Sequence, residues 1–598
     1  MDDVTEPVGR TPLAAPMRAP ILDPRLGDFE SDHSAPKQRS LLAIAGSLVG
    51  EISLPKLAVI WTLQILAPAV LLGLAPLVLT AWIGEASNRF DEASDIGAVI
   101  VVIAAAAAVV YGWRPLFRLA ESNFWSLNAL AVQPGYAFWR EAIRHLAERS
   151  LKGRTGQEFA RIRRASCAAA GVILFVVAGL VAGLVWPATR WIGSVADLGS
   201  PLGLVLPTVA NAVVVMSAYL AVASLVWGLA DASADQPLDL AAAPAPAPGA
   251  RVFRVAHLSD VHVVGERYGL RIESGRAGAR GNGRFGRALA RLSAIHANNP
   301  LDLVLFTGDM TDAGTSAEWA EFLDILAAFP ELAARTLVLP GNHDVNIVDR
   351  ANPARLDLPT SPMKTLRRMR ALSVFAAVQG DRVRTVSGGS TVLLAKALEP
   401  RRADIEAFAN RSGFRLSQRL QSLWAEIFPL ILPPDGPDGL GVAILDSNAD
   451  THFSFTNALG LIPVEQAKRL KAAFEAYPRA GWIVALHHHV IEYPRPVATF
   501  AERIGTALIN GGWFLRELKP YAQRIVVMHG HRHVDWVGAC GVLTIISAPS
   551  PVMAPESRDT HFYVQTLTVD PDGRVSLLAP ERVELAAEPA IQPALAVA

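Results

Sequence analysis

The sequence is poor in cysteine and in charged residues, and both shortages limit what the protein can be. Only two of its 598 residues are cysteines, Cys167 and Cys540, which excludes a disulfide framework and a thiolate zinc site. Charged residues make up 18% of the chain, whereas hydrophobic residues reach 51% and the mean hydropathy is +0.29. Lysine plus arginine and aspartate plus glutamate both number 55, so the net charge is zero. This balance argues against a basic nucleic-acid binder, and we expect no nucleic-acid partner.

The hydrophobic excess lies before residue 231, in four stretches without a charged residue. These stretches are residues 57–84, 96–113, 165–189 and 198–230. A helix needs about 20 apolar residues to cross the bilayer hydrocarbon. Buried helices of a soluble bundle would show polar residues every three or four positions, and these stretches do not. We therefore expect an all-α membrane domain with four transmembrane helices, at about 57–83, 96–113, 166–188 and 201–229.

Basic residues indicate how these helices are oriented. Residues 1–56 hold six lysines and arginines and residues 114–164 hold ten, whereas 85–95 and 190–197 hold one each. Basic residues collect in cytoplasmic loops. We therefore expect a multi-pass integral membrane protein whose N-terminus, loop 114–164 and C-terminal domain are cytoplasmic. Its partners would be the lipid bilayer and, through the transmembrane helices, possible further copies of the chain in a homo-oligomer.

The rest of the chain divides by composition. We expect a polar, disordered segment at the N-terminus, an extended Ala/Pro linker after the membrane domain, a soluble α/β domain and a short tail. The N-terminal segment is residues 1–50, the membrane domain 51–232 and the linker 233–250. The α/β domain is residues 251–585 and the tail 586–598.

In the soluble domain, short β-rich runs end abruptly in polar clusters. The runs are residues 253–258, 302–306, 336–340, 482–486 and 524–528. Helical patterns lie between them, for example at 315–328 and 464–476. Strands that alternate with helices indicate an α/β domain, in which ligands gather at the carboxyl ends of the strands.

Metal-binding side chains stand directly after these runs. Asp260 and His262 are two positions apart, so on an extended chain both point the same way. Further oxygen and nitrogen donors are Asp309, Asn342, His487, His531 and His533. Carboxylate, amide and imidazole together suit Mn, Fe, Zn, Co or Ni. Seven ligands are too many for one tetrahedral zinc and suit two divalent metal ions that share a carboxylate. Such a pair polarises a phosphate ester and activates a bridging water for hydrolysis.

The order and wording of these clusters, namely DxH, GD, GNHD, a mid-chain His and GHxH, resemble the calcineurin-like metallophosphoesterase family over residues 251–570. The resemblance implies a four-layer sandwich in which two mixed β-sheets are flanked by helices. It also implies a role for each ligand. The first metal would be held by Asp260, His262 and His533, the second by Asn342, His487 and His531, and both by Asp309. His488 is an alternative to His487 as the ligand in the triple histidine.

The resemblance implies two further catalytic residues. His343 would not bind metal but would face the leaving group and act as a general acid. Asp312 would orient His343, or would instead cap the helix expected at 315–328.

Two insertions stand between the motifs, at 263–290 and 345–440. The Arg/Gly-rich stretch 265–291 holds seven arginines, which could bind an anionic substrate, contact anionic lipid or form a solvated loop. We expect the second insertion to form a cap over the site.

The sequence thus predicts a membrane-anchored, cytoplasm-facing hydrolase that acts on a phosphate-ester substrate. We expect a dinuclear-metal phosphodiesterase in which a metal-bridging hydroxide attacks the phosphate. One alternative is a hydrolase of a lipid-linked diphosphate at the inner leaflet. Another is a non-catalytic membrane sensor or scaffold that uses the same fold.

Overall fold

The computed structural model describes most of the chain. The described residues are 15–28, 66–92, 132–150, 156–265, 280–349, 361–387, 390–411, 413–452, 454–494, 508–555 and 558–587, with 58, 62, 100, 103, 107, 110, 111, 267, 355, 357 and 506. The chain forms two compact units, of which one is built mainly from Leu54–Ala234 and the other holds the α/β domain.

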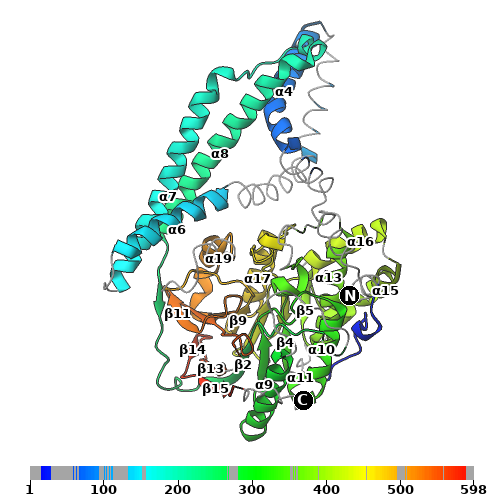
Figure 1. Cartoon of the computed structure of the whole chain (residues 1–598), viewed down its shortest axis with the longest axis vertical. Coiled ribbons are helices and arrows are strands. Elements are labelled where there is room, and N and C mark those ends of the chain that lie inside the picture. The colour runs from blue at the N-terminus through cyan, green and yellow to red at the C-terminus, as the bar shows by residue number, and fades with distance from the viewer. Residues whose placement is uncertain are drawn as a thin grey trace, which may run out of the picture. The chain divides into compact units, whose positions relative to one another are not determined.

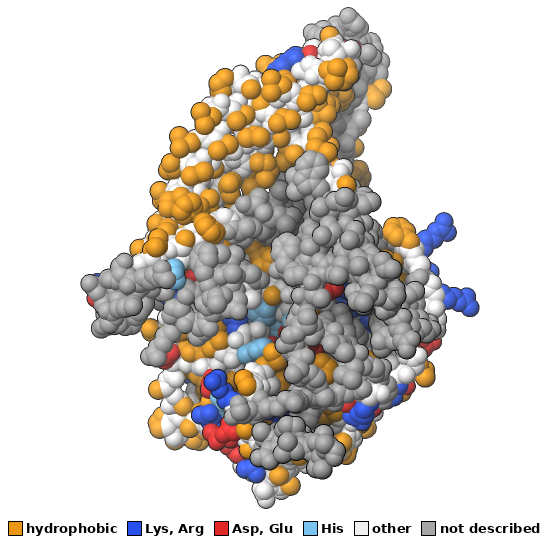
Figure 2. Space-filling view, viewed as in Figure 1, with side chains coloured by type: hydrophobic (Ala, Val, Ile, Leu, Met, Phe, Trp, Pro, Cys, Tyr) orange, Lys and Arg blue, Asp and Glu red, His pale blue; other side chains and the backbone are white. Residues whose placement is uncertain are grey.

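The first unit is helical. Three of its segments are long and apolar enough to cross a membrane. Ala67–Glu85 lies in α4 (Ala67–Glu92), Ala160–Ala188 comprises most of α7 (Gly156–Val185) and the short helix after it, and Pro201–Ser233 comprises α8 (Val205–Ser233) and the short helix before it. Hydrophobic side chains cover most of their visible face in Figure 2. An exposed apolar surface of this extent indicates association with a membrane. The predicted span 96–113 lies almost wholly outside the described residues, so the structure describes three of the four expected helices.

Helices α7 and α8 cross where each has a glycine. A Cβ atom on Gly171 would lie 2.7 Å from the carbonyl oxygen of Ser224 and 3.1 Å from the Cα atom of Gly228. Small residues of this kind let transmembrane helices approach closely. Near the ends of these helices, α6 (Gln133–Ser150) packs on α7 and donates a hydrogen bond of 3.0 Å from Tyr136 to Asp231 of α8.

The second unit contains two mixed β-sheets. The larger sheet has nine strands in the order β1-β11-β12-β10-β9-β8-β7-β5-β6, and the smaller has the order β14-β13-β2-β3-β4, with β15 paired to β13. The larger sheet comprises β1 (Pro237–Asp239), β5 (Arg384–Ser387), β6 (Ser390–Leu393), β7 (Leu430–Leu432), β8 (Leu440–Ile444), β9 (Gly481–Ala485), β10 (Ile525–His529), β11 (Trp536–Cys540) and β12 (Leu543–Ser547). The smaller comprises β2 (Arg251–Leu258), β3 (Leu303–Phe306), β4 (Thr336–Val338), β13 (Thr560–Val569), β14 (Val575–Leu577) and β15 (Glu581–Leu585).

Parallel strands form the centre of the larger sheet and one side of the smaller sheet. They are β8, β9, β10 and β12 in one and β2, β3 and β4 in the other. Most of these strands are buried along their whole length, as expected for parallel strands covered on both faces. The five strands and two helices expected from the sequence are confirmed, within a few residues at their ends.

Side chains alternate between two hydrophobic cores along the strands of the larger sheet. Ile483 and Ala485 face a core shared with the smaller sheet, whereas Trp482 and Val484 face a second core. The shared core also receives α9 (Arg280–Asn298), α10 (Ser316–Ala327), α11 (Pro330–Ala333), α13 (Pro362–Gln379), α15 (Arg402–Arg411) and α16 (Phe414–Ile427). The second core is covered by α17 (Val464–Ala476) and α19 (Gly511–Leu518). Figure 1 shows α10 and α13 to the right of strands β2 and β4. The two sheets and the helices that cover them confirm the predicted sandwich.

Three segments differ from the sequence expectation. Residues 233–250 are more than a linker, because β1 pairs with β11 at the edge of the larger sheet and Asp239 accepts a hydrogen bond of 3.0 Å from Trp536. Insertion 345–440 contributes the largely buried helix α13 and strands β5, β6 and β7 to the fold, so much of it is core and not a cap. Residues 15–28, expected to be disordered, contact α10 and α13.

The glycine contact between α7 and α8 is testable in the full-length protein in detergent. Gly171→Leu should lower the unfolding free energy by about 1–3 kcal/mol, because the new side chain forces the helices apart. Gly179→Leu is the matched control, since nothing lies within 4 Å of a Cβ atom there. Thermal unfolding measures both variants, and equal stability of the two would contradict this packing.

Candidate metal centre

The sequence-predicted ligands converge from both sheets, at the carboxyl ends of five parallel strands. Asp260 and His262 follow β2, Asp309 follows β3 and Asn342 follows β4. From the larger sheet, His487 follows β9, while His531 and His533 follow β10. All of them are buried except His531 and His533, which are partly exposed.

The backbone adopts a left-handed conformation at most of these ligands. Among the described residues, the non-glycine residues with positive φ are Asp260 (57°), His262 (40°), Asp309 (53°), His531 (75°) and His533 (54°). Each such residue costs of order 1–3 kcal/mol, and this strain is typical of functional sites, where the surroundings hold it in place. Every one of the five is a predicted metal ligand.

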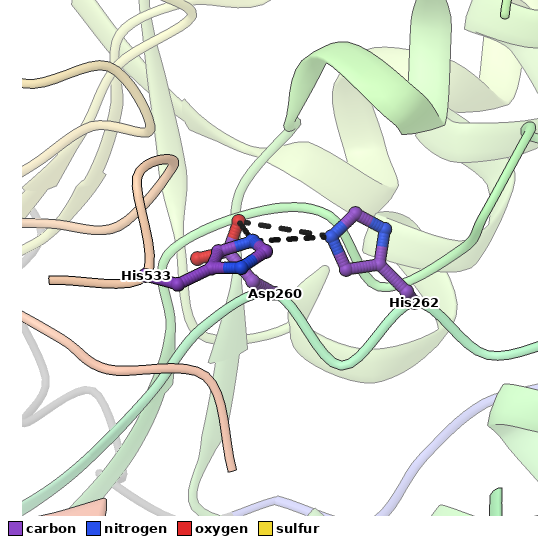
Figure 3. Close-up of side chains that lie close together, drawn as sticks. All are labelled: Asp260, His262 and His533. Carbon is purple, nitrogen blue, oxygen red and sulfur yellow. Dashed lines mark hydrogen bonds and ion pairs between the residues drawn. The ribbon is translucent and has the colours of Figure 1, made fainter. Parts of the chain in front are cut away.

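Asp260, His262 and His533 form one group (Figure 3). The Nε2 atom of His533 lies 3.3 Å from Oδ1 of Asp260 and 3.4 Å from Nε2 of His262. The three donor atoms fit within 4.8 Å of one another and could hold a metal ion. The chain can come this close only because residue 530 is glycine. A Cβ atom there would lie 1.8 Å from Oγ of Ser259 and 2.5 Å from Oδ2 of Asp260.

A second group forms around His487. Its Nε2 atom lies 3.1 Å from Oδ1 of Asn342 and 3.1 Å from Nδ1 of His531. The Nδ1 atom of His487 lies 2.8 Å from the carbonyl oxygen of Thr307 and therefore donates a hydrogen bond to it. That bond leaves the lone pair of Nε2 free to face Asn342 and His531, as a metal-ligating histidine requires.

Asp309 lies between the two groups. Its Oδ2 atom is 3.7 Å from Nε2 of His262 and 3.4 Å from Nε2 of His487, while Oδ1 accepts a hydrogen bond of 2.9 Å from the backbone of His343. Burial opposes ionisation of this carboxyl, but the rings of His487, His343 and His262 outweigh it and hold the pKa of Asp309 well below its usual range. Asp309 is thus a carboxylate within reach of both groups.

These donors fit divalent metal ions. Two imidazole nitrogens that bind one ion in adjacent positions at about 2.1 Å are about 3 Å apart, close to the separation of His487 and His531. In the described part of the chain, the groups that form ion pairs with Asp260 and Asp309 are histidines and no lysine or arginine. Two buried carboxylates that lack a fixed cation are the environment that a bound metal would neutralise.

His343 stands at the edge of this cluster. Its ring packs edge-on against His262 at a centroid distance of 4.6 Å, and its Nδ1 atom lies 2.6 Å from the backbone carbonyl oxygen of Asp312. The carbonyl accepts a hydrogen bond from the Nδ1–H group and so fixes the ring, which leaves Nε2 for chemistry.

Asp312 contacts His343 as expected, but through a different group from the expected carboxylate. The residue holds His343 through its backbone carbonyl, while its carboxylate Oδ1 lies 3.5 Å from Nδ1 of His262. The alternative of helix capping is also wrong, because Thr315 caps α10 together with Glu318. A carboxylate behind a metal-ligating imidazole raises its basicity, so the side chain of Asp312 is placed to support His262.

The triple histidine is ordered by Ser447, which the sequence did not single out. The Oγ atom of Ser447 accepts hydrogen bonds of 3.2 Å from the backbone of His487 and of His488, and it lies 2.8 Å from Nδ1 of His488. Burial and the adjacent His487 and His489 hold the pKa of His488 well below its usual range, so its ring is neutral. His487, and not His488, is therefore the histidine whose ring nitrogen lies close to Asn342 and Asp309.

Asp344, the last residue of GNHD, was also missed. Its carboxylate accepts hydrogen bonds of 2.9 Å from the backbone of Gly341, 2.9 Å from the backbone of Thr311 and 2.7 Å from the Thr311 hydroxyl. It therefore joins the loop that carries Asp309 to the loop that carries Asn342 and His343. Its place inside the motif was the signal that could have identified it.

Two arginines of the Arg/Gly-rich stretch have structural partners. Arg284 is buried and donates hydrogen bonds of 3.0 Å to the carbonyl of Ala554 and 2.8 Å to that of Arg558. Arg267 forms an ion pair of 2.8 Å with Glu321. Residues 268–279 lie outside the described part of the chain.

Comparisons with known proteins identify the family that the domain resembles. The family model described as calcineurin-like phosphoesterase matches residues 253–535. A probable cyclic nucleotide phosphodiesterase from Coxiella burnetii is 28% identical over 130 residues, which cover 22% of this chain and 47% of that protein. The chain therefore matches about half the length of this relative.

Solved structures of low similarity were also found. A dimetal phosphatase from Danio rerio is 12% identical, with a TM-score of 0.31. The match covers 56% of this chain and 99% of the phosphatase chain. A purple acid phosphatase from yellow lupin is 13% identical, with a TM-score of 0.27. The match covers 55% of this chain and 51% of the lupin chain. On the family match, residues 253–535 form a calcineurin-like phosphoesterase domain, which belongs to a family of metal-dependent hydrolases of phosphate esters.

Proposed function

We propose that the protein is a membrane-anchored phosphodiesterase with two divalent metal ions bridged by Asp309. The observation that carries the proposal is the position of the Asp309 carboxylate, whose Oδ2 atom lies within 3.7 Å of an imidazole nitrogen in each ligand group. Asp260, His262 and His533 would hold one ion, and Asn342, His487 and His531 the other. When bound, the ions would polarise the phosphate and activate the attacking water.

The protein's own side chains would orient the site and move protons. Asp344 and Ser447 hold the ligand loops, and the carboxylate of Asp312 supports His262. His343, held at Nδ1 by the carbonyl of Asp312, would donate a proton from Nε2 to the leaving oxygen. Without that proton the leaving group would depart as an alkoxide, so this step matters most for poor leaving groups.

The substrate class is supported by similarity. The relative from Coxiella burnetii is described as a probable cyclic nucleotide phosphodiesterase, which favours a phosphodiester. A lipid-linked diphosphate is the second candidate, because three helices are apolar enough to cross a membrane. We propose that the domain faces the cytoplasm, on the basis of the lysines and arginines in residues 1–56 and 114–164.

Metal binding should stabilise the fold. Mn²⁺ added to chelator-treated full-length protein should raise the melting temperature, because the ion binds only the folded site. At 1,000 times the dissociation constant the stabilisation would be about 4 kcal/mol. His487→Ala should lose most of this shift, whereas Asp438→Asn, an exposed carboxylate of the same domain, should keep it. An equal shift in the His487 variant and the unmodified protein would contradict the assignment.

Asp309→Asn should reduce turnover by about 100-fold or more, since loss of a supporting residue alone costs 10–100-fold at metal sites. The measurement is hydrolysis of an aryl phosphodiester and an aryl phosphomonoester by metal-reloaded full-length protein. Faster hydrolysis of the diester would support the diesterase. No metal-dependent hydrolysis of either ester would favour the lipid-linked substrate, which can be tested with the same full-length protein.

His343→Ala should separate substrates by leaving group. A general acid contributes about 10²–10⁴-fold, so an alkyl ester should lose about 100-fold in kcat. An activated aryl ester, whose leaving group needs no proton, should lose less than about 10-fold. Equal losses on both esters would argue against proton donation by this residue.

A further inference from the structure

The N-terminal arm, residues 15–28, is bound to the phosphoesterase domain. Its backbone donates hydrogen bonds from Ala15 to the carbonyl of Ala334 and from Arg18 to that of Ala377, at 2.9 and 2.8 Å. Leu22 donates a third, of 2.6 Å, to the hydroxyl of Ser373. Met17, Ile21 and Leu22 also pack against the hydrophobic core. The arm is therefore a part of the domain, although the membrane helices separate the two in sequence.

The arm ends in a buried ion pair. Both carboxylate oxygens of Asp28 accept hydrogen bonds from Arg370 of α13, one from Nε and the other, at 2.5 Å, from a terminal nitrogen. The two side chains are only 4% and 3% exposed. A buried arginine needs such a partner, because an unpaired charge in the interior is strongly unfavourable. This two-pronged contact also fixes the plane of the guanidinium group.

The same guanidinium group reaches the loop after β3. A terminal nitrogen of Arg370 donates a hydrogen bond of 3.2 Å to the carbonyl of Gly314. Gly314 has a φ of +68° and packs directly on the GNHD segment, since a Cβ atom there would lie 2.5 Å from the carbonyl oxygen of Asp344 and 3.3 Å from that of His343. Two residues earlier, the carbonyl of Asp312 holds Nδ1 of His343 at 2.6 Å.

We infer that the N-terminal arm positions the proton donor of the active site. Asp28 orients Arg370, Arg370 holds the loop 312–314 at Gly314, and the carbonyl of Asp312 in that loop fixes the ring of His343. The inference rests on the proposed function for the role of His343 and goes beyond it, because no contact described for Asp28 or Arg370 reaches the ligand groups or the ring of His343. They are positioning residues.

Anchoring of the arm to the domain does not require the ion pair between Asp28 and Arg370. The arm is already anchored by three backbone hydrogen bonds, by its apolar side chains and by an ion pair of Arg25 with Asp324 of α10, whose side chains are 35% and 21% exposed. Asp28 and Arg370 add a buried charge pair, which often stabilises no more than apolar residues of the same volume. What this pair supplies is a rigid contact with the loop that carries Asp312.

The test compares two charge-removing variants on the same arm in the full-length, metal-reloaded protein. Asp28→Asn should lower kcat on an alkyl phosphodiester by about 10-fold or more, and on an activated aryl diester by less than about 3-fold, with little change in KM. Arg25→Gln, which removes the exposed pair, should leave both rates unchanged. Arg370→Lys keeps the charge but loses the two-pronged contact and should behave like Asp28→Asn. Equal losses on both esters, or the same effect from Arg25→Gln, would overturn the inference.

Hydrogen exchange measured by mass spectrometry gives a readout that does not need activity. In Asp28→Asn and Arg370→Lys, the amides of residues 310–316 and 341–346 should exchange faster than in the unmodified protein, and in Arg25→Gln they should not. Unchanged exchange in these segments would overturn the inference even if rates fell. If the unmodified protein hydrolyses no phosphate ester, the proposed function fails, while the exchange data still decide whether the arm holds the loop.

Discussion

Two buried carboxylates surrounded by histidines are the constraint on which the rest of the domain depends. Asp260 and Asp309 are almost fully inaccessible, and in the described residues only imidazoles form ion pairs with them. Removing a carboxylate from water costs several kcal/mol. The left-handed backbone at five ligand positions adds further cost. Both costs are tolerable if a cation occupies the site, which is why the geometry supports a metal centre more directly than any single motif does.

The fold brings these groups together through its parallel strands. Because β2, β3 and β4 run in one direction in one sheet, and β9 and β10 in the other, the loops at their carboxyl ends meet. Close approach then requires residues without a side chain, as at Gly530. Outside this layer, hydrogen-bonded side chains such as Asp344 and Ser447 join one loop to the next. Arg370 of α13 also joins two segments: its guanidinium group binds Asp28 of the N-terminal arm and the carbonyl of Gly314 in the loop after β3.

Much of this could be predicted because the signal is local. Apolar runs without charge indicate membrane helices, and short apolar strands followed by Asp, His and Asn indicate a metal-binding edge. The expectations for residues 15–28, 233–250 and 345–440 were less successful. Their polar, Ala/Pro-rich or basic composition resembles a disordered arm, a spacer and a cap, yet each gains partners distant in sequence. Composition describes what a segment can do alone, whereas β1 and α13 owe their structure to the surfaces that they cover.

The sequence by itself determined the apolar character of the helices that are long enough to cross a membrane, the alternation of strands and helices, and the identity of the residues that follow each strand. Only the tertiary structure decided which atoms meet. It assigned the carbonyl of Asp312 to His343 and its carboxylate to His262, and it turned His487 toward Asn342. It also paired Asp28 with Arg370, 342 positions away. The physical reason is that hydrogen bonds and ion pairs depend on distances of a few ångströms, which no pattern along the chain specifies until the sheets and helices are packed.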